Sequence, residues 1–292
     1  MHIYPYELPL PFLRPRIASV DDFLEPFSNE MIDQAERMGA DVLVFPDRPW
    51  MGEAIRLGKT DTVKIALLSF RSYDQWWASL RREARVSVKH PLKLGATVKR
   101  VEQPSDQVVA EILAIFKETP FRENRFFPGY YAWNESEVRR EINTDRQNLS
   151  VVTTWRGRVA GVSHMRFFGQ VAKVMQFLTS LEARRDCRGL SNLMMAKQVE
   201  LLTEVGVRHI IYAKFGALPS LDAFKVRNGF RPVAVNYNHI LLTPKAQALA
   251  KLGLHRRSDV WLSRYSRSII PFLASLQRLL PPSLIMRMGL YA

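Results

Sequence analysis

The stretch that decides the fold runs from Cys187 to Phe230. It opens with CRGLSN (187–192), continues as an amphipathic helix to Gly206 and a strand over residues 207–215, and closes with SLDAFKVRNGF (220–230). A glycine turn that opens a helix gathers unpaired backbone N–H groups at the positive end of the helix dipole, where they suit a phosphate or a developing oxyanion. The Asn-Gly pair at 228–229 predicts a left-handed helix end, after which a new strand begins.

The residues before this stretch alternate regularly between strand and helix periods. A strand is expected over residues 95–102, a helix over 105–118 and a proline-broken loop over 119–132. Asn134 is a plausible N-cap for a helix through residue 143. Strands then follow over 149–155, 158–167 and 171–181. After the stretch, strands over 230–242 complete a run of strand, two helices, three strands, helix, strand, helix and strands.

This order resembles the GNAT superfamily of N-acyltransferases over about residues 95–243. The pair Phe224-Lys225 before NGF (228–230) resembles its Fem-like branch more than its ordinary acetyltransferases. The resemblance implies an α/β (α+β) fold, with a mixed, mostly antiparallel sheet flanked by helices. It also implies an enzyme that moves an acyl group from an activated donor to a primary amine, for instance on a lipid or envelope precursor.

Three regions are expected along the chain. Residues 1–94 hold short strands and an Arg-rich helix over 73–90. Together with KLGATV (93–98), that helix resembles the stretch between the halves of Fem-like transferases, which duplicate the GNAT fold. Residues 1–94 are therefore interpreted as a partial GNAT-like copy, and 95–247 as the transferase domain. Residues 248–292 are expected to form a basic amphipathic helical tail, which either binds an anionic membrane or packs on the core.

Composition limits the partners and the compartment. A net charge of +14 draws the protein toward RNA, anionic lipid or a phosphate-bearing cofactor. The single cysteine excludes an intrachain disulfide, and no Cys or His cluster has the spacing of a metal site, so no metal is expected. The prolines near the N-terminus argue against a signal peptide, and Arg278 with Pro281-Pro282 argues against a transmembrane helix. A cytoplasmic protein is expected, either free or peripheral at the inner face of the membrane.

The acyl group is expected along the strand over residues 171–181. The resemblance implies that the acyl carbonyl lies beside the segment that includes Gln176, Phe177 and Leu178. If the preceding hairpin pivots on Gly169, Val162 lies opposite Gln176 and His164 opposite Val174, so His164 and Gln176 share a face. An imidazole with a pKa near seven would serve as the general base for the attacking amine. The alternative for His164 is a half-buried residue bonded to backbone.

Further site candidates follow from the resemblance and from residue chemistry. Phe224 and Lys225 are expected to stabilise the acyl carbonyl, unless Lys225 is a solvated helix residue and Phe224 belongs to the core. Tyr212 is a spare acid, and Glu118 is an alternative base. Arg122 and Arg125 would bind phosphate or carboxylate on the substrate, unless they form a salt-bridged loop.

The identity of the donor stays open between two classes. Acyl-CoA is slightly preferred, because Arg188, Gly189, Leu190, Ser191 and Asn192 stand where acyl-CoA users keep a pyrophosphate loop, although only one glycine is present. The alternative is that Ser191 or Asn192 is a simple N-cap that needs no ligand. An aminoacyl-tRNA donor is favoured by the Phe-Lys pair, the incomplete loop and the charge. A third interpretation is a non-catalytic GNAT-fold protein that binds RNA or a membrane.

Overall fold

The computed structural model describes residues 3–7, 16–20, 23–53, 58–118, 121–122, 125–126, 133–216 and 219–251. The predicted basic tail lies outside these residues from position 252 onward, so both alternatives for it stay predictions. In the ranges just given, no helix is both long enough and apolar enough to cross a membrane.

The chain divides into two compact units. Among the described residues, the first unit comprises those up to 65 together with 232–251, and the second comprises those from 66 to 231. These boundaries fall at other positions than those of the predicted domains. Residues 66–94 group with the second unit, and residues 232–247 group with the first.

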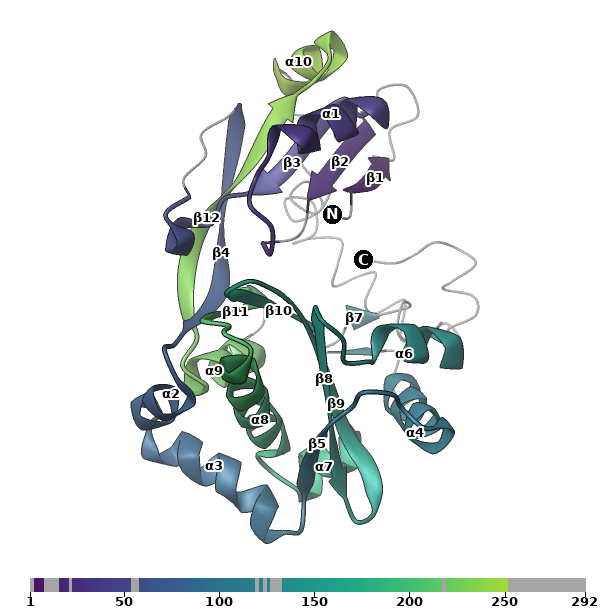
Figure 1. The fold of residues 1–292 in the computed structure, drawn as a ribbon, viewed down its shortest axis with the longest axis vertical. Helices are drawn as coiled ribbons and strands as arrows, with labels where there is room; N and C mark the ends of the chain where they lie inside the picture. The colour runs from purple at the N-terminus through teal and green to yellow at the C-terminus, as the bar shows by residue number, and fades with distance from the viewer. Residues whose placement is uncertain are drawn as a thin grey trace. The chain divides into compact units, whose positions relative to one another are not determined.

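The first unit is a sheet with helix α1 (Asn29–Arg37) beside it (Figure 1). Its strands run in the order β1 (Ile3–Glu7), β2 (Arg16–Val20), β3 (Val42–Pro46), β12 (Arg231–Leu241) and β4 (Lys59–Ser69). All five residues of β3 are buried, as expected of a strand covered on both faces. The short helix η1 (Pro49–Met51) and helix α10 (Pro244–Lys251) complete the unit.

The second unit continues from the last residues of β4, which it includes. Its strands follow in the order β4, β11 (His209–Lys214), β10 (Val171–Thr179), β9 (Arg158–Phe168), β8 (Asn148–Trp155) and β5 (Thr97–Arg100). A separate two-stranded ribbon pairs β6 (Phe121–Arg122) with β7 (Arg125–Phe126). The helices are α2 (Tyr73–Ser79), α3 (Arg82–Lys93), α4 (Asp106–Lys117), α6 (Glu135–Glu141), α7 (Leu181–Asp186), α8 (Leu190–Glu204) and α9 (Pro219–Arg227).

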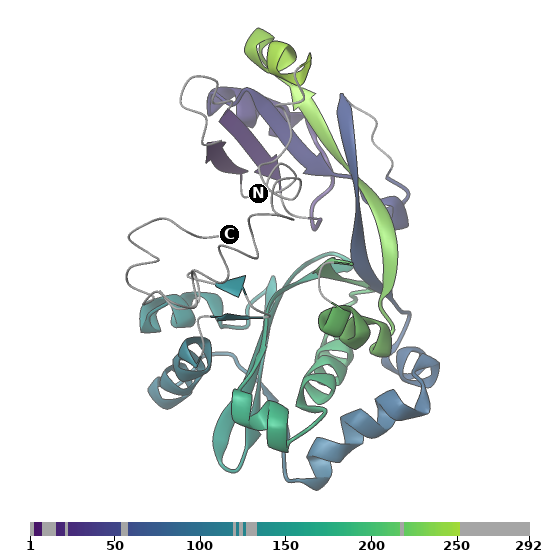
Figure 2. The ribbon, with the colours of Figure 1, turned by 180° about the vertical axis from the view of Figure 1, so that it is seen from behind.

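Helices cover both faces of the sheet in the second unit. Figures 1 and 2 show α4 and α6 on one side of β8, β9 and β10, and α8 and α9 on the other side. Each side has its own core. Val152, Val162 and Leu178 pack with α4 and α6, whereas Leu149, Met165 and other buried residues pack with α8. Because successive strand residues point to opposite faces, the two cores tell which face each site residue occupies.

Two helices begin where the sequence predicts. Ser105 accepts a hydrogen bond from the N–H of Val108 at the start of α4, and Asn134 forms a reciprocal capping box with Glu137 at the start of α6. The prediction of one helix over residues 73–90 is wrong in one respect, because this stretch forms two separate helices, α2 and α3. Leu80 between them adopts an extended backbone (ψ 141°) and buries its side chain in the core.

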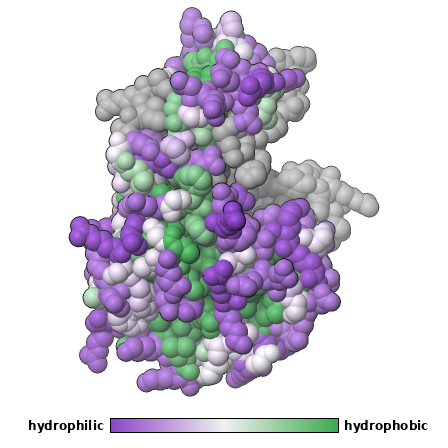
Figure 3. Space-filling model, viewed as in Figure 1, coloured by the Kyte–Doolittle hydropathy of each residue, from purple (hydrophilic) through white to green (hydrophobic). Residues whose placement is uncertain are grey.

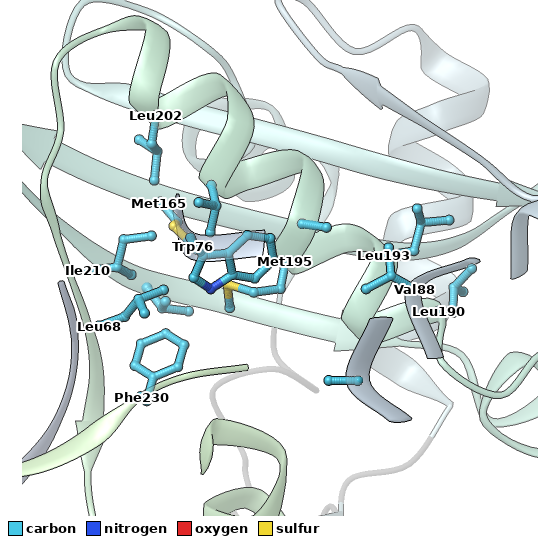
Figure 4. Packing of buried hydrophobic residues seen from close by; sticks show 14 of the residues in the cluster. Leu68, Trp76, Val88, Met165, Leu190, Leu193, Met195, Leu202, Ile210 and Phe230 are labelled. Atoms are coloured by element: carbon cyan, nitrogen blue, oxygen red, sulfur yellow. The ribbon is translucent and has the colours of Figure 1, made fainter. Parts of the chain in front are cut away.

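Trp76 joins α2 to the end of α9. Figure 4 shows its ring in the middle of the α8-side core, near Met165 and Met195. The indole N–H donates to the carbonyl of Asn228 at 3.0 Å. Gly229 follows with φ 88°, as the Asn-Gly pattern predicts, and a Cβ there would lie 3.4 Å from Leu68 and 3.6 Å from Trp76. These are ordinary contact distances, so the left-handed conformation is what favours glycine at this position.

Candidate active site

Strands β10 and β11 pair for only part of their lengths. Their parallel ladder joins Val171–Lys173 to His209–Ile211, whereas β10 continues to Thr179 and β11 to Lys214. On its other side, β10 has a bulge between Val174 and Gln176, which leaves Met175 outside the ladder with β9. Backbone groups that leave a ladder are available to a ligand, so this segment of β10 is the natural centre of a site.

The predicted register of the β9–β10 hairpin is wrong by two residues. His164 lies opposite Gln176, Val162 lies opposite Leu178, and Val174 lies opposite Met165. One residue of the difference arises because the turn contains both Gly169 and Gln170, and the other arises from the bulge at Met175. His164 and Gln176 still share a face, as expected, and they do so as direct cross-strand partners.

Three aromatic side chains meet beside β10 on its α8 side. The ring centroid of Phe177 lies 5.7 Å from that of Tyr212 and 5.5 Å from that of Phe224, and those of Tyr212 and Phe224 are 6.2 Å apart. All three are half-buried at the edge of the core. Figure 3 shows hydrophobic residues gathered in a band over the region of α8 and α9 on this face. The sequence named all three residues without predicting that they touch.

Lys225 is buried beside these rings and is not a solvated helix residue. Its side chain is 1% exposed. The ammonium donates to the carbonyl oxygen of Lys214 at 2.6 Å, lies 3.5 Å from a carboxylate oxygen of Asp222, and sits 5.4 Å from the ring centroid of Tyr212. A charge removed from water needs such partners. The result is a fixed cation beside Tyr212, whose ring in turn packs against Phe177 of β10.

His164 belongs to β9, lies on the opposite face of the sheet from these rings, and is 2% exposed. Its Nδ1 is 2.8 Å from the hydroxyl oxygen of Ser150. That hydroxyl donates its one proton to the carbonyl of Asn143 at 2.6 Å, so its oxygen accepts from Nδ1. Neutral His164 therefore carries its proton on Nδ1 and presents a lone pair at Nε2.

Burial lowers the pKa of His164 to about 4, with Glu141 and Asp145 opposing the shift and Arg166 adding to it. The expectation of a pKa near seven is therefore wrong. Imidazolium is disfavoured where little water reaches the ring. At neutral pH, His164 is a hydrogen-bond acceptor and only a weak base.

The glycine turn at the start of α8 has a packing role. Gly189 has φ 91° and occupies the N-cap position, so neither Ser191 nor Asn192 is the cap. A Cβ on Gly189 would lie 2.1 Å from the backbone oxygen of Ser87 in α3. Asn192 is buried, and its amide donates to the side-chain oxygen of Asn228 at 3.3 Å. The glycine is thus explained by the contact with α3 without any phosphate.

The remaining predicted residues are scattered. Glu118 accepts the N–H of Leu181 at 2.7 Å, so it caps the first turn of α7. Arg188 is exposed at the start of α8, and Leu178 and Leu190 are buried in the two cores. Arg122 and Arg125 face each other across the β6–β7 ribbon, and their side chains lie outside the description.

Sequence reasoning missed the partners of the central residues. Ser150 and Asn143 set the tautomer of His164, and Asp222 with the carbonyl of Lys214 holds Lys225. Only Asp222 left a usable signal, since it stands three residues before Lys225 on one helix face.

Comparisons with known proteins place the fold. No family model matches the sequence, and no curated protein matches it. The structure of FemX is similar with a TM-score of 0.56 at 12% identity, covering 83% of this chain and 85% of FemX. The C-terminal domain of a putative lysylphosphatidylglycerol synthetase from Agrobacterium fabrum is similar with a TM-score of 0.50 at 15% identity, covering 87% of this chain and 82% of that one. At such identities the likeness shows the fold alone, and it confirms the predicted fold class, a mixed sheet flanked by helices.

Proposed function

We propose that this protein is an acyltransferase that moves an acyl group from an activated donor to a primary amine. The observation that carries the proposal is the buried ammonium of Lys225 beside Tyr212, whose ring packs against Phe177 in the part of β10 that has left the ladder with β11. When an amine nitrogen attacks an acyl carbonyl, the carbonyl oxygen gains negative charge. A cation held in a site from which water is largely excluded stabilises that charge far better than a solvated one does.

The two faces of β10 suit the two substrates. Phe177, Tyr212 and Phe224 offer aromatic surface to the acyl donor on the α8 side, where Lys225 also lies. His164 and Gln176 face the α4 side and offer acceptor atoms to the amine. In the proposed reaction, the new C–N bond forms at β10, the bond to the leaving oxygen or sulfur breaks, and the leaving group takes the proton that the amine loses.

We propose aminoacyl-tRNA as the donor, in place of the acyl-CoA that the glycine turn favoured. Because the contact of Gly189 with Ser87 accounts for that turn, the turn no longer argues for a pyrophosphate. The Phe224-Lys225 pair resembles the Fem-like branch, and the net charge of +14 suits a polyanion. The compared domain bears the name of a lysylphosphatidylglycerol synthetase, which supports an aminoacyl group as cargo. A tRNA donor implies reaction in the cytoplasm.

The test is donor consumption by the purified full chain. A mixture of charged tRNAs and, in parallel, a set of acyl-CoA thioesters are each incubated with the protein and n-butylamine, and amide formation is measured by mass spectrometry. We expect amide from charged tRNA, and we expect Lys225→Met to lower its rate about 100-fold. Methionine keeps most of the volume of the side chain and removes the charge.

Lys197→Met on α8 is the matched control, because Lys197 is partly exposed and bonds only to Glu200 among its described neighbours. Its rate should equal that of the unmodified protein. Amide formed from acyl-CoA alone would replace the proposed donor. If neither donor is consumed faster than in buffer, or if Lys225→Met leaves the rate unchanged, the proposal is wrong.

A further inference from the structure

We propose that His164 Nε2 and Gln176 Oε1 form a two-acceptor site that selects a primary amine over a hydroxyl group. The inference rests on the proposed function, because the site would bind the amine acceptor of that reaction. It gives the pair a recognition role, which differs from the general-base role that the sequence suggested for His164.

Both atoms can accept a hydrogen bond, and they belong to neighbouring side chains on one face of the sheet. Ser150 fixes the proton of His164 on Nδ1, so Nε2 offers a lone pair at the tip of the ring, away from the backbone. Gln176 Oε1 is buried and has no hydrogen-bond partner within the described part of the chain. A buried polar atom without a partner costs about 1–3 kcal/mol, which a bound donor would recover.

The two acceptors lie side by side. His164 and Gln176 are cross-strand partners, and the side chains of such partners leave an antiparallel pair about 5 Å apart on the same face. Because the two side chains start about 5 Å apart on one face, a nitrogen placed between their ends can donate to both. The bulge at Met175 creates this arrangement, because without it Gln176 would not stand opposite His164.

The number of donor hydrogens sets the selectivity. An amine or ammonium nitrogen has at least two N–H bonds and can satisfy both acceptors at once. A hydroxyl group has one O–H and leaves the other acceptor unpaired. Sites built in this way reject the ligand that lacks a hydrogen-bond partner, because a buried polar group is then left unsatisfied. The pair thus favours an amine where hydroxyl and amine acceptors compete.

The nitrogen signals of His164 test the site without any acyl donor. The full chain is labelled with 15N-histidine, and the His164 signals are assigned by their loss in His164→Asn. Long-range 1H–15N spectra at pH 7.5 should show Nδ1 protonated and Nε2 unprotonated. On titration, n-butylammonium should shift Nε2 and saturate, and n-butanol should bind at least ten-fold more weakly.

Two variants and a control separate the two acceptors. Gln176→Leu should weaken n-butylammonium binding about ten-fold, the effect of one hydrogen bond to a charged group. Ser150→Ala removes the acceptor that holds the proton on Nδ1, so the proton should appear on Nε2 and amine binding should fall. Thr153→Val is the control. Thr153 is buried on the same strand as Ser150 but on the α8 side, so this change should leave both the protonation of His164 and the binding of n-butylammonium unchanged.

The inference is overturned if n-butanol binds as well as n-butylammonium, if Gln176→Leu has no effect, or if Nε2 is protonated in the unmodified protein. These results are independent of the transfer assay. Transfer that depends on Lys225 without amine selectivity would reject this site alone. Selective amine binding without consumption of any donor would reject the proposed function alone.

Discussion

The buried histidine makes the stability of this protein depend on pH in a predictable way. Burial lowers the pKa of His164 from its ordinary value of 6.5 to about 4. Between these values the unfolded chain binds a proton that the folded protein does not bind. The free energy of unfolding therefore falls as the pH falls from 7 toward 4, and the His164 contribution is level below that range.

The size of the effect follows from the two pKa values. At about 1.4 kcal/mol per unit, the whole difference amounts to about 3 kcal/mol, of which about 2 kcal/mol is lost between pH 7 and pH 5. The neighbouring carboxylate of Asp145 adds little over this range. The pKa of Asp145 lies below its ordinary range, since hydrogen bonds from Gln147 and Asn148 outweigh the effect of its burial.

Urea unfolding at pH 7 and pH 5 measures the effect when the protein is compared with His164→Asn. The asparagine amide takes the place of Nδ1 and donates to Ser150, but it does not titrate in this range. We expect the unmodified protein to lose about 2 kcal/mol more than the variant between these pH values. His209→Asn is the control. Burial alone lowers the pKa of the half-buried His209 imidazole. The loss of unfolding free energy between pH 7 and pH 5 should therefore differ less between the unmodified protein and His209→Asn than between the unmodified protein and His164→Asn.

Equal losses in the unmodified protein and in His164→Asn would refute the reasoning. Such a result would mean that water reaches the ring in the folded protein, because only desolvation is large enough to keep the imidazole neutral. It would also remove the basis for a neutral acceptor at Nε2.

Three further predictions concern stability and location. Gly189→Ala should lower the free energy of unfolding by more than about 2 kcal/mol, because the new Cβ would lie 2.1 Å from the backbone oxygen of Ser87. Gly157→Ala should lower it by only about 1 kcal/mol. Gly157 also has a positive φ, but a Cβ there would have no atom within 4 Å. Equal costs would mean that α3 does not press on the turn. Trp76→Phe should cost about 1–3 kcal/mol, because the carbonyl of Asn228 loses a buried donor, and an effect no larger than that of the half-buried Trp77→Phe would contradict this. Deleting residues 258–292 should abolish sedimentation with anionic vesicles and leave a folded remainder. Each cation that is lost contributes about 1 kcal/mol to membrane binding. Early melting of the remainder would instead favour a tail that packs on the core.

The order of the elements could be read from the sequence. Helix and strand periods depend on residues within one or two turns of each other, and the caps at Ser105 and Asn134 are equally local. The end of α9 at Asn228-Gly229 was predicted for the same reason, since the left-handed conformation favours glycine whatever surrounds it. These signals were sufficient for the order of the elements, and the family resemblance of that order led to Lys225, Phe224 and His164 as candidates.

The chemistry of those candidates was decided by residues far away in the chain. Burial and a pKa depend on what packs against a group in three dimensions, so no local pattern revealed that Lys225 is enclosed or that Ser150 fixes the proton of His164. Gly189 has the appearance of a phosphate turn in sequence, but a contact with Ser87, about a hundred residues earlier, explains it. The register of His164 and Gln176 was likewise beyond sequence reasoning, because one bulged residue shifts every later pair on the strand. The sequence alone therefore determined the elements and their order, whereas the acceptor pair and the buried cation exist only where the tertiary structure brings distant residues into contact.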